Sequence, residues 1–66
     1  MATVDDSVLI RFELTDCEAL ALAQLCKRIG FGELRINAVN EIEAYSMGRA
    51  LERVREGLAR EGYAPR

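Results

Sequence analysis

The sequence predicts a small α+β domain in which one N-terminal strand, at residues 8–14, precedes two main helices. Apolar and polar residues alternate over 8–14, which is the period of a half-buried strand. Two later segments carry apolar residues at helical spacing, each preceded by a good capping residue. The strand has no second strand in the chain to pair with, so we expect it to pair antiparallel with its copy in a homodimer.

Length and composition place the chain among small single domains. The 66 residues leave room for one domain over 1–66, with a flexible acidic leader at 1–6. Half of the residues are apolar, which favours a compact aliphatic core. A chain this short buries only about 60% of its unfolded surface, which also favours association. No apolar run is long enough for a membrane span and no signal peptide opens the chain, so we expect a cytoplasmic protein.

The charge is unevenly distributed. The net charge is −2, but residues 1–26 hold five acidic groups and one basic group, whereas residues 27–66 hold eight basic and six acidic groups. A protein that depends on phosphate contacts usually has a basic balance or a basic face. We therefore do not expect nucleic acid as a partner.

The strand should turn one face to the core and the other to the dimer partner. The expected core face consists of Val8, Ile10, Phe12 and Leu14. The opposite face consists of Leu9, Arg11 and Glu13. Arg11 and Glu13 would pair with their copies across the dimer and fix its register. The predicted dimer interface is therefore Leu9, Arg11, Glu13 and Leu20.

The first helix should begin at a capping box. Thr15 and Glu18 have the required spacing, and Asp16 adds negative charge to the first turn. Gly30 is a natural residue to end the helix. The expected apolar stripe is Ala19, Leu22, Leu25, Cys26 and Ile29. Leu20 and Cys17 fall on the polar side, where they would form a second contact patch of the dimer.

Residues 32–39 fit two structures. Leu34, Ile36 and Ala38 alternate with polar residues, as in a strand, but a single helical turn over 32–37 fits equally well. We favour the short helix. The last helix should run from 41 to 61, with Asn40 as N-cap and Gly62 at its end. The predicted core of the domain consists of Ile10, Phe12, Leu22, Leu25, Ile29, Leu51, Val54 and Leu58.

The residues do not support catalysis, a metal site or a cofactor. The chain has no histidine, so the commonest general base is absent. Cys17 and Cys26 are nine positions apart on one helix, which is half a turn out of phase and roughly 13 Å along the axis. They are too far apart for a disulfide and have no further thiol or imidazole group for zinc.

Two groups of residues are candidates for binding a partner. The acidic N-terminal half could occupy a basic, nucleic-acid-binding surface of a host protein complex, through Asp5, Asp6, Glu13 and Asp16. Tyr45, near Arg49 on the side of the last helix away from the core, is a second candidate, because exposed tyrosines often anchor interfaces. The alternative for Tyr45 is that it packs under the connection at residues 30–39.

The order strand, helix, helix resembles ribbon-helix-helix repressors, whose paired strands enter the DNA major groove. This resemblance implies a DNA-binding regulator, with a basic surface built by Arg11, Arg49, Arg53 and Arg55 across the dimer. Leu9 and Glu13 on the outward strand face match an anionic groove poorly.

A second resemblance covers most of the chain. Residues 14–16, 18–24, 27–28, 43–45, 47, 50–51 and 62–65 are similar to an uncharacterised family of short proteins from proteobacterial phages and integrative elements. This resemblance implies a non-enzymatic interaction protein of a mobile element, and inhibition of a host defence complex, such as an anti-CRISPR activity.

Overall fold

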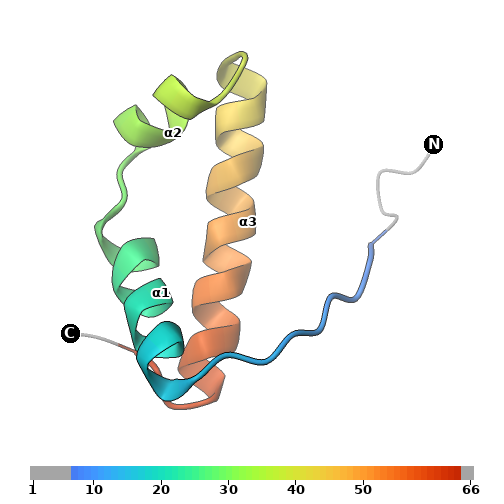
Figure 1. The fold of residues 1–66 in the computed structure, drawn as a ribbon. Coiled ribbons are helices and arrows are strands. Elements are labelled where there is room, and N and C mark those ends of the chain that lie inside the picture. Colours follow the sequence, from blue (N-terminus) through green and yellow to red (C-terminus); the bar gives the residue numbers. More distant parts are fainter. Residues whose placement is uncertain (1–6, 65–66) are drawn as a thin grey trace.

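The fold is a long C-terminal helix with two shorter helices packed along it. The computed structural model describes residues 7–64, which contain three helices, α1 (Asp16–Arg28), α2 (Phe31–Asn37) and α3 (Glu41–Arg60). Both α1 and α2 pack on α3, and within the described residues they make no contact with each other. Figure 1 shows α2 beside the start of α3, with α1 beside its later turns.

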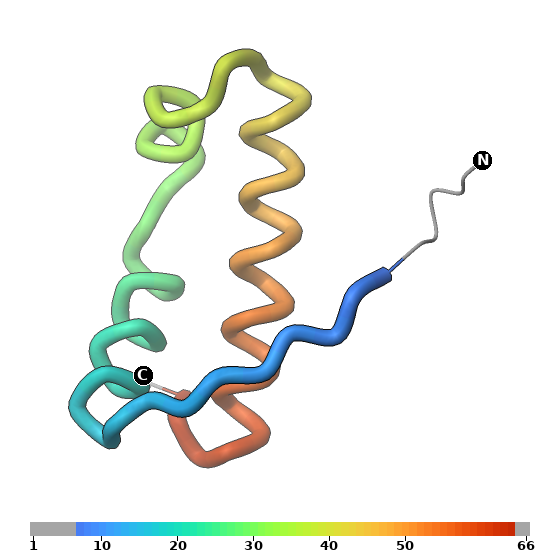
Figure 2. Tube along the Cα trace, turned by 45° about the vertical axis from the view of Figure 1, so that its right-hand side comes forward, coloured from blue at the N-terminus to red at the C-terminus, as the bar shows by residue number. Residues whose placement is uncertain are grey.

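The predicted N-terminal strand is wrong, and with it the α+β class and the paired strands of a homodimer. Residues 7–14 form an extended segment, called the arm below, and no strand occurs in residues 7–64. The arm makes no backbone hydrogen bond to any other described residue. An extended segment becomes a strand only through a neighbouring backbone, and no other described segment of the chain provides one. Figure 2 shows the arm crossing beside the later turns of α3 and then running away from the helices.

The predicted start of the first helix is confirmed. The backbone N–H of Glu18 donates to Thr15 Oγ1 at 3.1 Å, and the Thr15 N–H donates to Glu18 Oε1 at 3.0 Å. These two bonds satisfy donors that a helix start otherwise leaves unpaired. Four consecutive residues, 15–18, therefore determine where α1 begins.

Gly30 follows the C-cap of α1, as predicted, but it does not adopt the left-handed conformation of a helix-ending glycine. It has φ −108° and serves as the N-cap of α2, and its N–H donates to Glu33 Oε1 at 2.6 Å. The extended conformation of the C-cap residue, Ile29, takes the chain off the helix axis. The favoured short helix is confirmed as α2, and it begins at Phe31, one residue before the predicted turn.

Both predicted ends of the last helix are confirmed. Asn40 Oδ1 accepts the Glu43 N–H at 2.9 Å, while the Glu43 carboxylate accepts the Val39 N–H at 2.7 Å. At the other end, Gly62 has φ 98°, a conformation that glycine adopts without steric cost. The N–H groups of Gly62 and Tyr63 donate to the carbonyls of Ala59 and Leu58, which is the Schellman arrangement.

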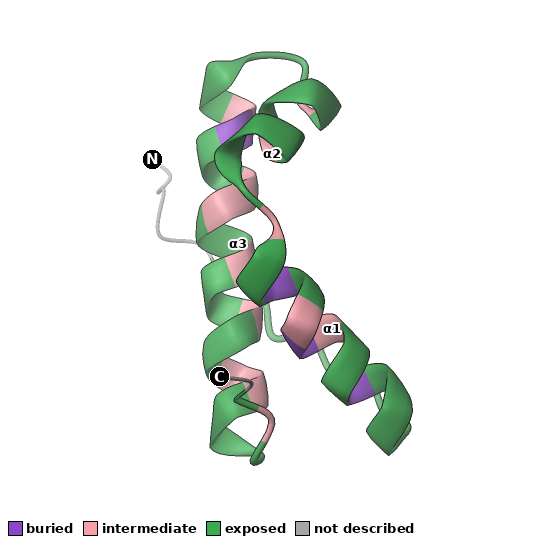
Figure 3. Ribbon diagram, turned by 90° about the vertical axis from the view of Figure 1, so that its left-hand side faces the viewer, coloured by how far each residue is buried: buried purple, intermediate pink, exposed green. Residues whose placement is uncertain are grey.

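The buried core is smaller than predicted and consists of small side chains. The buried residues are Ala19, Ala23, Cys26 and Ala44 (Figure 3). Of the predicted core, Leu22, Ile29, Leu51, Val54 and Leu58 are only half-buried. The prediction is wrong for Ile10, Phe12 and Leu25, which are 69%, 63% and 52% exposed. The arm leaves Ile10 and Phe12 uncovered, and α1 buries Ala19 and Ala23 in place of Leu25.

Candidate protein-binding surfaces

Two apolar surfaces stay open on the three helices, one at each end of α3. The first is a groove between the arm and the helices. Its apolar lining consists of Ile10, Phe12 and Leu14 from the arm, Leu22 from α1, and Val54 and Leu58 from α3. The groove has a volume of about 950 Å³. It is called the arm groove below.

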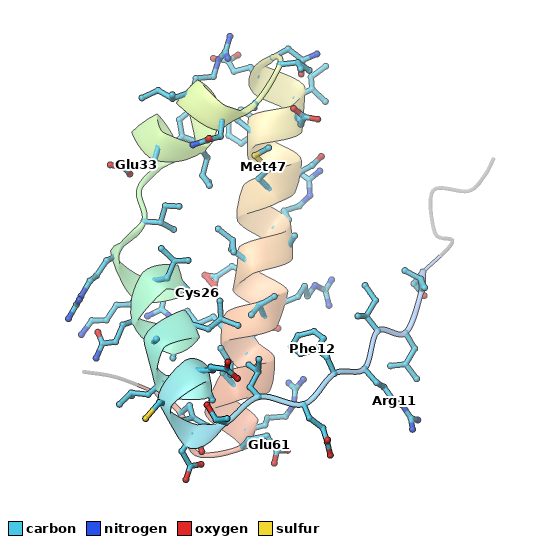
Figure 4. All side chains as sticks on the ribbon, viewed as in Figure 1. Arg11, Phe12, Cys26, Glu33, Met47 and Glu61 are labelled. Atoms are coloured by element: carbon cyan, nitrogen blue, oxygen red, sulfur yellow. The ribbon has the colours of Figure 1, made fainter. Side chains whose placement is uncertain are left out.

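The arm presents different side chains to the groove and to solvent. Figure 4 shows the Phe12 ring turned toward α3 and the Arg11 side chain directed away from the helices. Leu9, predicted at a dimer interface, is 76% exposed and does not line the groove. The predicted alternation of faces is therefore kept only in part, since Arg11 and Glu13 line the groove together with Ile10, Phe12 and Leu14.

Charged residues of both signs border the arm groove. Arg11 and Glu13 come from the arm, and Arg53 and Glu61 come from α3 and the turn after it. The groove thus carries two basic and two acidic groups. Of the four arginines that the DNA-binding alternative needs, Arg11 and Arg53 line the groove, whereas Arg49 and Arg55 do not.

The end of the chain is tied to the start of α1 beside the groove. The Tyr63 hydroxyl donates a hydrogen bond to Asp16 Oδ1, across 47 positions of sequence. This hydrogen bond, with smaller contributions from burial and from the charges of Asp16 and Glu61, raises the pKa of Tyr63. Asp16, a predicted partner-binding residue, is therefore engaged within the chain.

The second apolar surface lies where α2 turns into α3. Ile36, Val39 and Ile42 are 83%, 82% and 76% exposed, and they fall within seven residues. These three residues are called the tip below. Among the described aliphatic side chains, Val8 and Leu9 of the arm are similarly exposed, at 77% and 76%.

Short-range hydrogen bonds fix the backbone of the tip. Asn37 Nδ2 donates to the Glu33 carbonyl at 2.8 Å, and the Ala38 N–H donates to the Arg35 carbonyl at 3.3 Å. The capping bonds at Val39 and Asn40 hold the start of α3. The exposure of the tip is therefore a property of a well-defined turn.

Tyr45 packs next to the tip. Its ring lies 4.9 Å from the ring of Phe31, centroid to centroid, at an interplanar angle of 39°. This geometry is typical of favourable aromatic pairs. Tyr45 keeps 56% of its surface exposed while it holds α2 against α3. Each of the two predictions for Tyr45 therefore holds in part. Its ring contacts the connection at residues 30–39, and more than half of its surface remains exposed to a partner.

The structure does not bring all predicted partner-binding residues together. Asp5 and Asp6 lie outside the described residues. Glu13 and Asp16 flank the junction of the arm and α1, whereas Tyr45 and Arg49 lie in the earlier turns of α3. Leu20, on α1, is 49% exposed. Sequence reasoning missed Ile36, Val39 and Ile42, whose only signal is that they are aliphatic and belong to no predicted core stripe.

A second, smaller cavity lies beside Cys26 and is lined by residues of α1, α2 and α3. It measures about 200 Å³ and is lined by Cys26, Ile29, Leu34 and Leu51, among others. Burial raises the pKa of the Cys26 thiol, and the charge of Arg55 opposes this shift. Within residues 7–64, no three histidine, cysteine or acidic side chains are grouped as metal ligands would be.

None of the described helices is long and apolar enough to cross a membrane. No curated protein and no solved structure matches the sequence. The model of one family, described as a family of unknown function (DUF7706), matches residues 1–66. The chain therefore belongs to the DUF7706 family.

Proposed function

We propose that this protein is a non-enzymatic binding protein that acts by contacting another protein through the tip. The observation that carries the proposal is the exposure of Ile36, Val39 and Ile42 on a turn whose backbone is fixed. Apolar side chains grouped on a surface mark sites of interaction. A preformed contact surface also loses little conformational entropy on binding.

The chemistry of the side chains supports binding over catalysis. The chain has no histidine, and its one buried thiol, Cys26, has a raised pKa, which lowers its reactivity. The carboxylates of Glu18, Glu33 and Glu43 accept backbone N–H groups at helix starts. Capping of the helices therefore accounts for these three acidic residues without a catalytic role.

The proposal includes a role for the acidic N-terminal residues. Asp5, Asp6, Glu13 and Asp16 would attract a partner with a basic surface and speed its association. Charge reversal at these positions should slow association at low salt and reduce its salt dependence. Glu13 also lines the arm groove, so reversal at Glu13 is compared with reversal at Asp5 and Asp6 alone.

The proposed biological setting is inhibition of a host defence complex such as CRISPR-Cas. Its support is the resemblance to proteins of phages and integrative elements, together with a structure that offers a contact surface. An inhibitor that blocks a surface needs no catalytic group. The test measures target cleavage or plasmid loss caused by a purified or plasmid-borne defence complex, in the presence and in the absence of this protein. A DNA-binding regulator is not favoured, because the described residues lack the strands that would enter the groove.

The contact surface is tested by charge substitution at the tip. The double variant Ile36→Arg, Ile42→Arg places both charges at exposed positions, so the helix content should not change. Leu20→Arg is the matched control, since Leu20 is an exposed aliphatic residue on α1. Tagged wild-type protein is used to isolate partners from a nuclease-treated proteobacterial lysate, and each partner is then purified.

The binding constants of the purified pair decide the result. We expect the tip variant to bind at least about 30-fold more weakly, which is the loss expected for residues central to an interface. Leu20→Arg should bind as the wild type does. Equal affinity of the tip variant and the wild type would place the contact elsewhere and overturn the proposal.

A further inference from the structure

The arm groove is unfilled, although it is built from the largest apolar residues of the arm. Phe12 and Ile10 are 63% and 69% exposed, while Leu22, Val54 and Leu58 opposite them are only half-buried. The volume of about 950 Å³ is far more than one side chain occupies. The described residues of the chain leave this apolar face in contact with water. Shielding it from water requires a partner that covers it.

The charges of the groove match a copy of the same face. Arg11 and Arg53 are balanced by Glu13 and Glu61. In a two-fold symmetric contact, the same surface meets itself, so each acidic residue can face a basic residue of the partner. A strongly charged partner of either sign would leave two of these groups opposed by like charge.

Gly57 leaves space at the floor of the groove. It lies in the interior of α3, where glycine costs helix stability relative to alanine. A Cβ at this position would meet only Arg60 Nη2, at 3.9 Å, so no packing within the chain requires glycine. The absence of a side chain does, however, keep the groove open at this point.

From these three observations we infer that the arm groove docks the arm-groove face of a second copy of this chain, forming a two-fold symmetric dimer through side-chain packing. Phe12 and Ile10 of each copy then pack into the groove of the other. The inference is independent of the tip, which lies at the other end of α3. A dimer would carry two tips, so it would bind a repetitive partner with increased avidity.

The oligomeric state of the full chain is the first test. We expect sedimentation equilibrium to give twice the 7.4 kDa chain mass at micromolar concentration. The melting temperature should also rise with protein concentration, because association stabilises the folded chain. A chain that remains monomeric at every accessible concentration would overturn the inference.

Two substitutions locate the interface. Gly57→Gln places a helix-favouring side chain in the groove and should give a monomer with at least wild-type helix content. Gly32→Gln is its matched control, since a Cβ there meets nothing within 4 Å and Gly32 does not line the groove. Phe12→Arg should also give a monomer, while Leu9→Arg, on the other side of the arm, should remain dimeric.

The contacts themselves can be observed in mixed dimers of isotope-labelled and unlabelled chains. We expect magnetisation transfer between Phe12 of one copy and Val54 or Leu58 of the other. A dimer that forms equally well with Gly57→Gln and Phe12→Arg uses another surface, and this result would contradict the inference. A monomer that still binds its partner through the tip would overturn the inference and leave the proposed function intact.

Discussion

The Tyr63 hydroxyl donates a hydrogen bond to the Asp16 carboxylate, which joins the last turn of the described chain to the first turn of α1. Tyr63 is placed there by the Schellman arrangement around Gly62, and Asp16 by the capping box of Thr15 and Glu18. Two local signals of the sequence therefore produce one long-range contact. This contact closes one end of the α1–α3 pair.

The Tyr63–Asp16 hydrogen bond should make stability depend on pH in the alkaline range. The bond needs the protonated phenol, so it raises the pKa of Tyr63 above the value of about 10 in an unfolded chain. Its contribution to stability is complete below about pH 10 and is lost as the pH rises through the raised pKa. Tyr63→Phe should lack this alkaline loss.

The pKa of Tyr63 can be followed by nuclear magnetic resonance of its ring carbon bonded to oxygen. Asp16→Ala should lower this pKa, because it removes the acceptor that is the largest cause of the shift. Glu61→Ala is the control, since the charge of Glu61 is the smallest cause, and it should lower the pKa less. An unchanged pKa in Asp16→Ala would show that the hydrogen bond does not persist in solution.

Two glycines should respond in opposite directions to alanine. Gly62 has φ 98°, so Gly62→Ala should reduce the free energy of unfolding by about 1–2 kcal/mol through strain alone, since no atom lies within 4 Å of the new Cβ. Gly32 lies in α2 with equally open space and no positive φ. Gly32→Ala should raise the free energy of unfolding by up to about 1 kcal/mol. Urea denaturation of both variants measures the two changes, and a loss of stability in both would contradict this account.

The helix ends could be predicted because each depends on residues close in sequence. Thr15 with Glu18, Asn40 with Glu43, and Gly62 after α3 form their bonds within a few positions, so their spacing carries the information. The place of Gly30 directly after the C-cap of α1 was predicted, but its second role as N-cap of α2 was not, because glycine suits both the end of one helix and the start of the next.

The strand could not be predicted in the same way. Alternation over residues 8–14 describes an extended chain with two faces, but a strand also needs a partner backbone that the segment itself does not specify. The predicted stripe of α1 holds for the buried Ala19 and Cys26, but ranking by hydrophobicity selects Leu25, whereas close approach to α3 selects the small residue Ala23. The tip was missed because Ile36, Val39 and Ile42 are aliphatic, and the pattern alone does not distinguish an interface from a core.

Ala44 should be sensitive to enlargement. It is 0% exposed and is the only buried residue of α3, at the end of the helix where α2 packs. Ala44→Leu should separate α2 from α3 and cost about 1–3 kcal/mol of the free energy of unfolding. Ala50→Leu adds the same atoms at an exposed position of the same helix and should change this quantity by less than about 0.5 kcal/mol.

A second observable separates Ala44→Leu from a general loss of stability. The Phe31–Tyr45 ring pair should give a near-ultraviolet circular dichroism signal that weakens when α2 moves. The signal should persist in Ala50→Leu. If Ala44→Leu keeps both its stability and this signal, then α2 does not pack against the first turns of α3.

The two cysteines should differ in reactivity, which tests the face that α1 turns toward α3. Cys17 is exposed, whereas Cys26 is buried and the pKa of its thiol is raised by that burial. Both the lower thiolate fraction and the restricted access should slow alkylation of Cys26 in the native protein. Mass spectrometry during iodoacetamide labelling should show Cys17 modified first, and in denaturant the two rates should become similar. Equal native rates would mean that α1 exposes Cys26, and the buried row of Ala19, Ala23 and Cys26 would then not face α3.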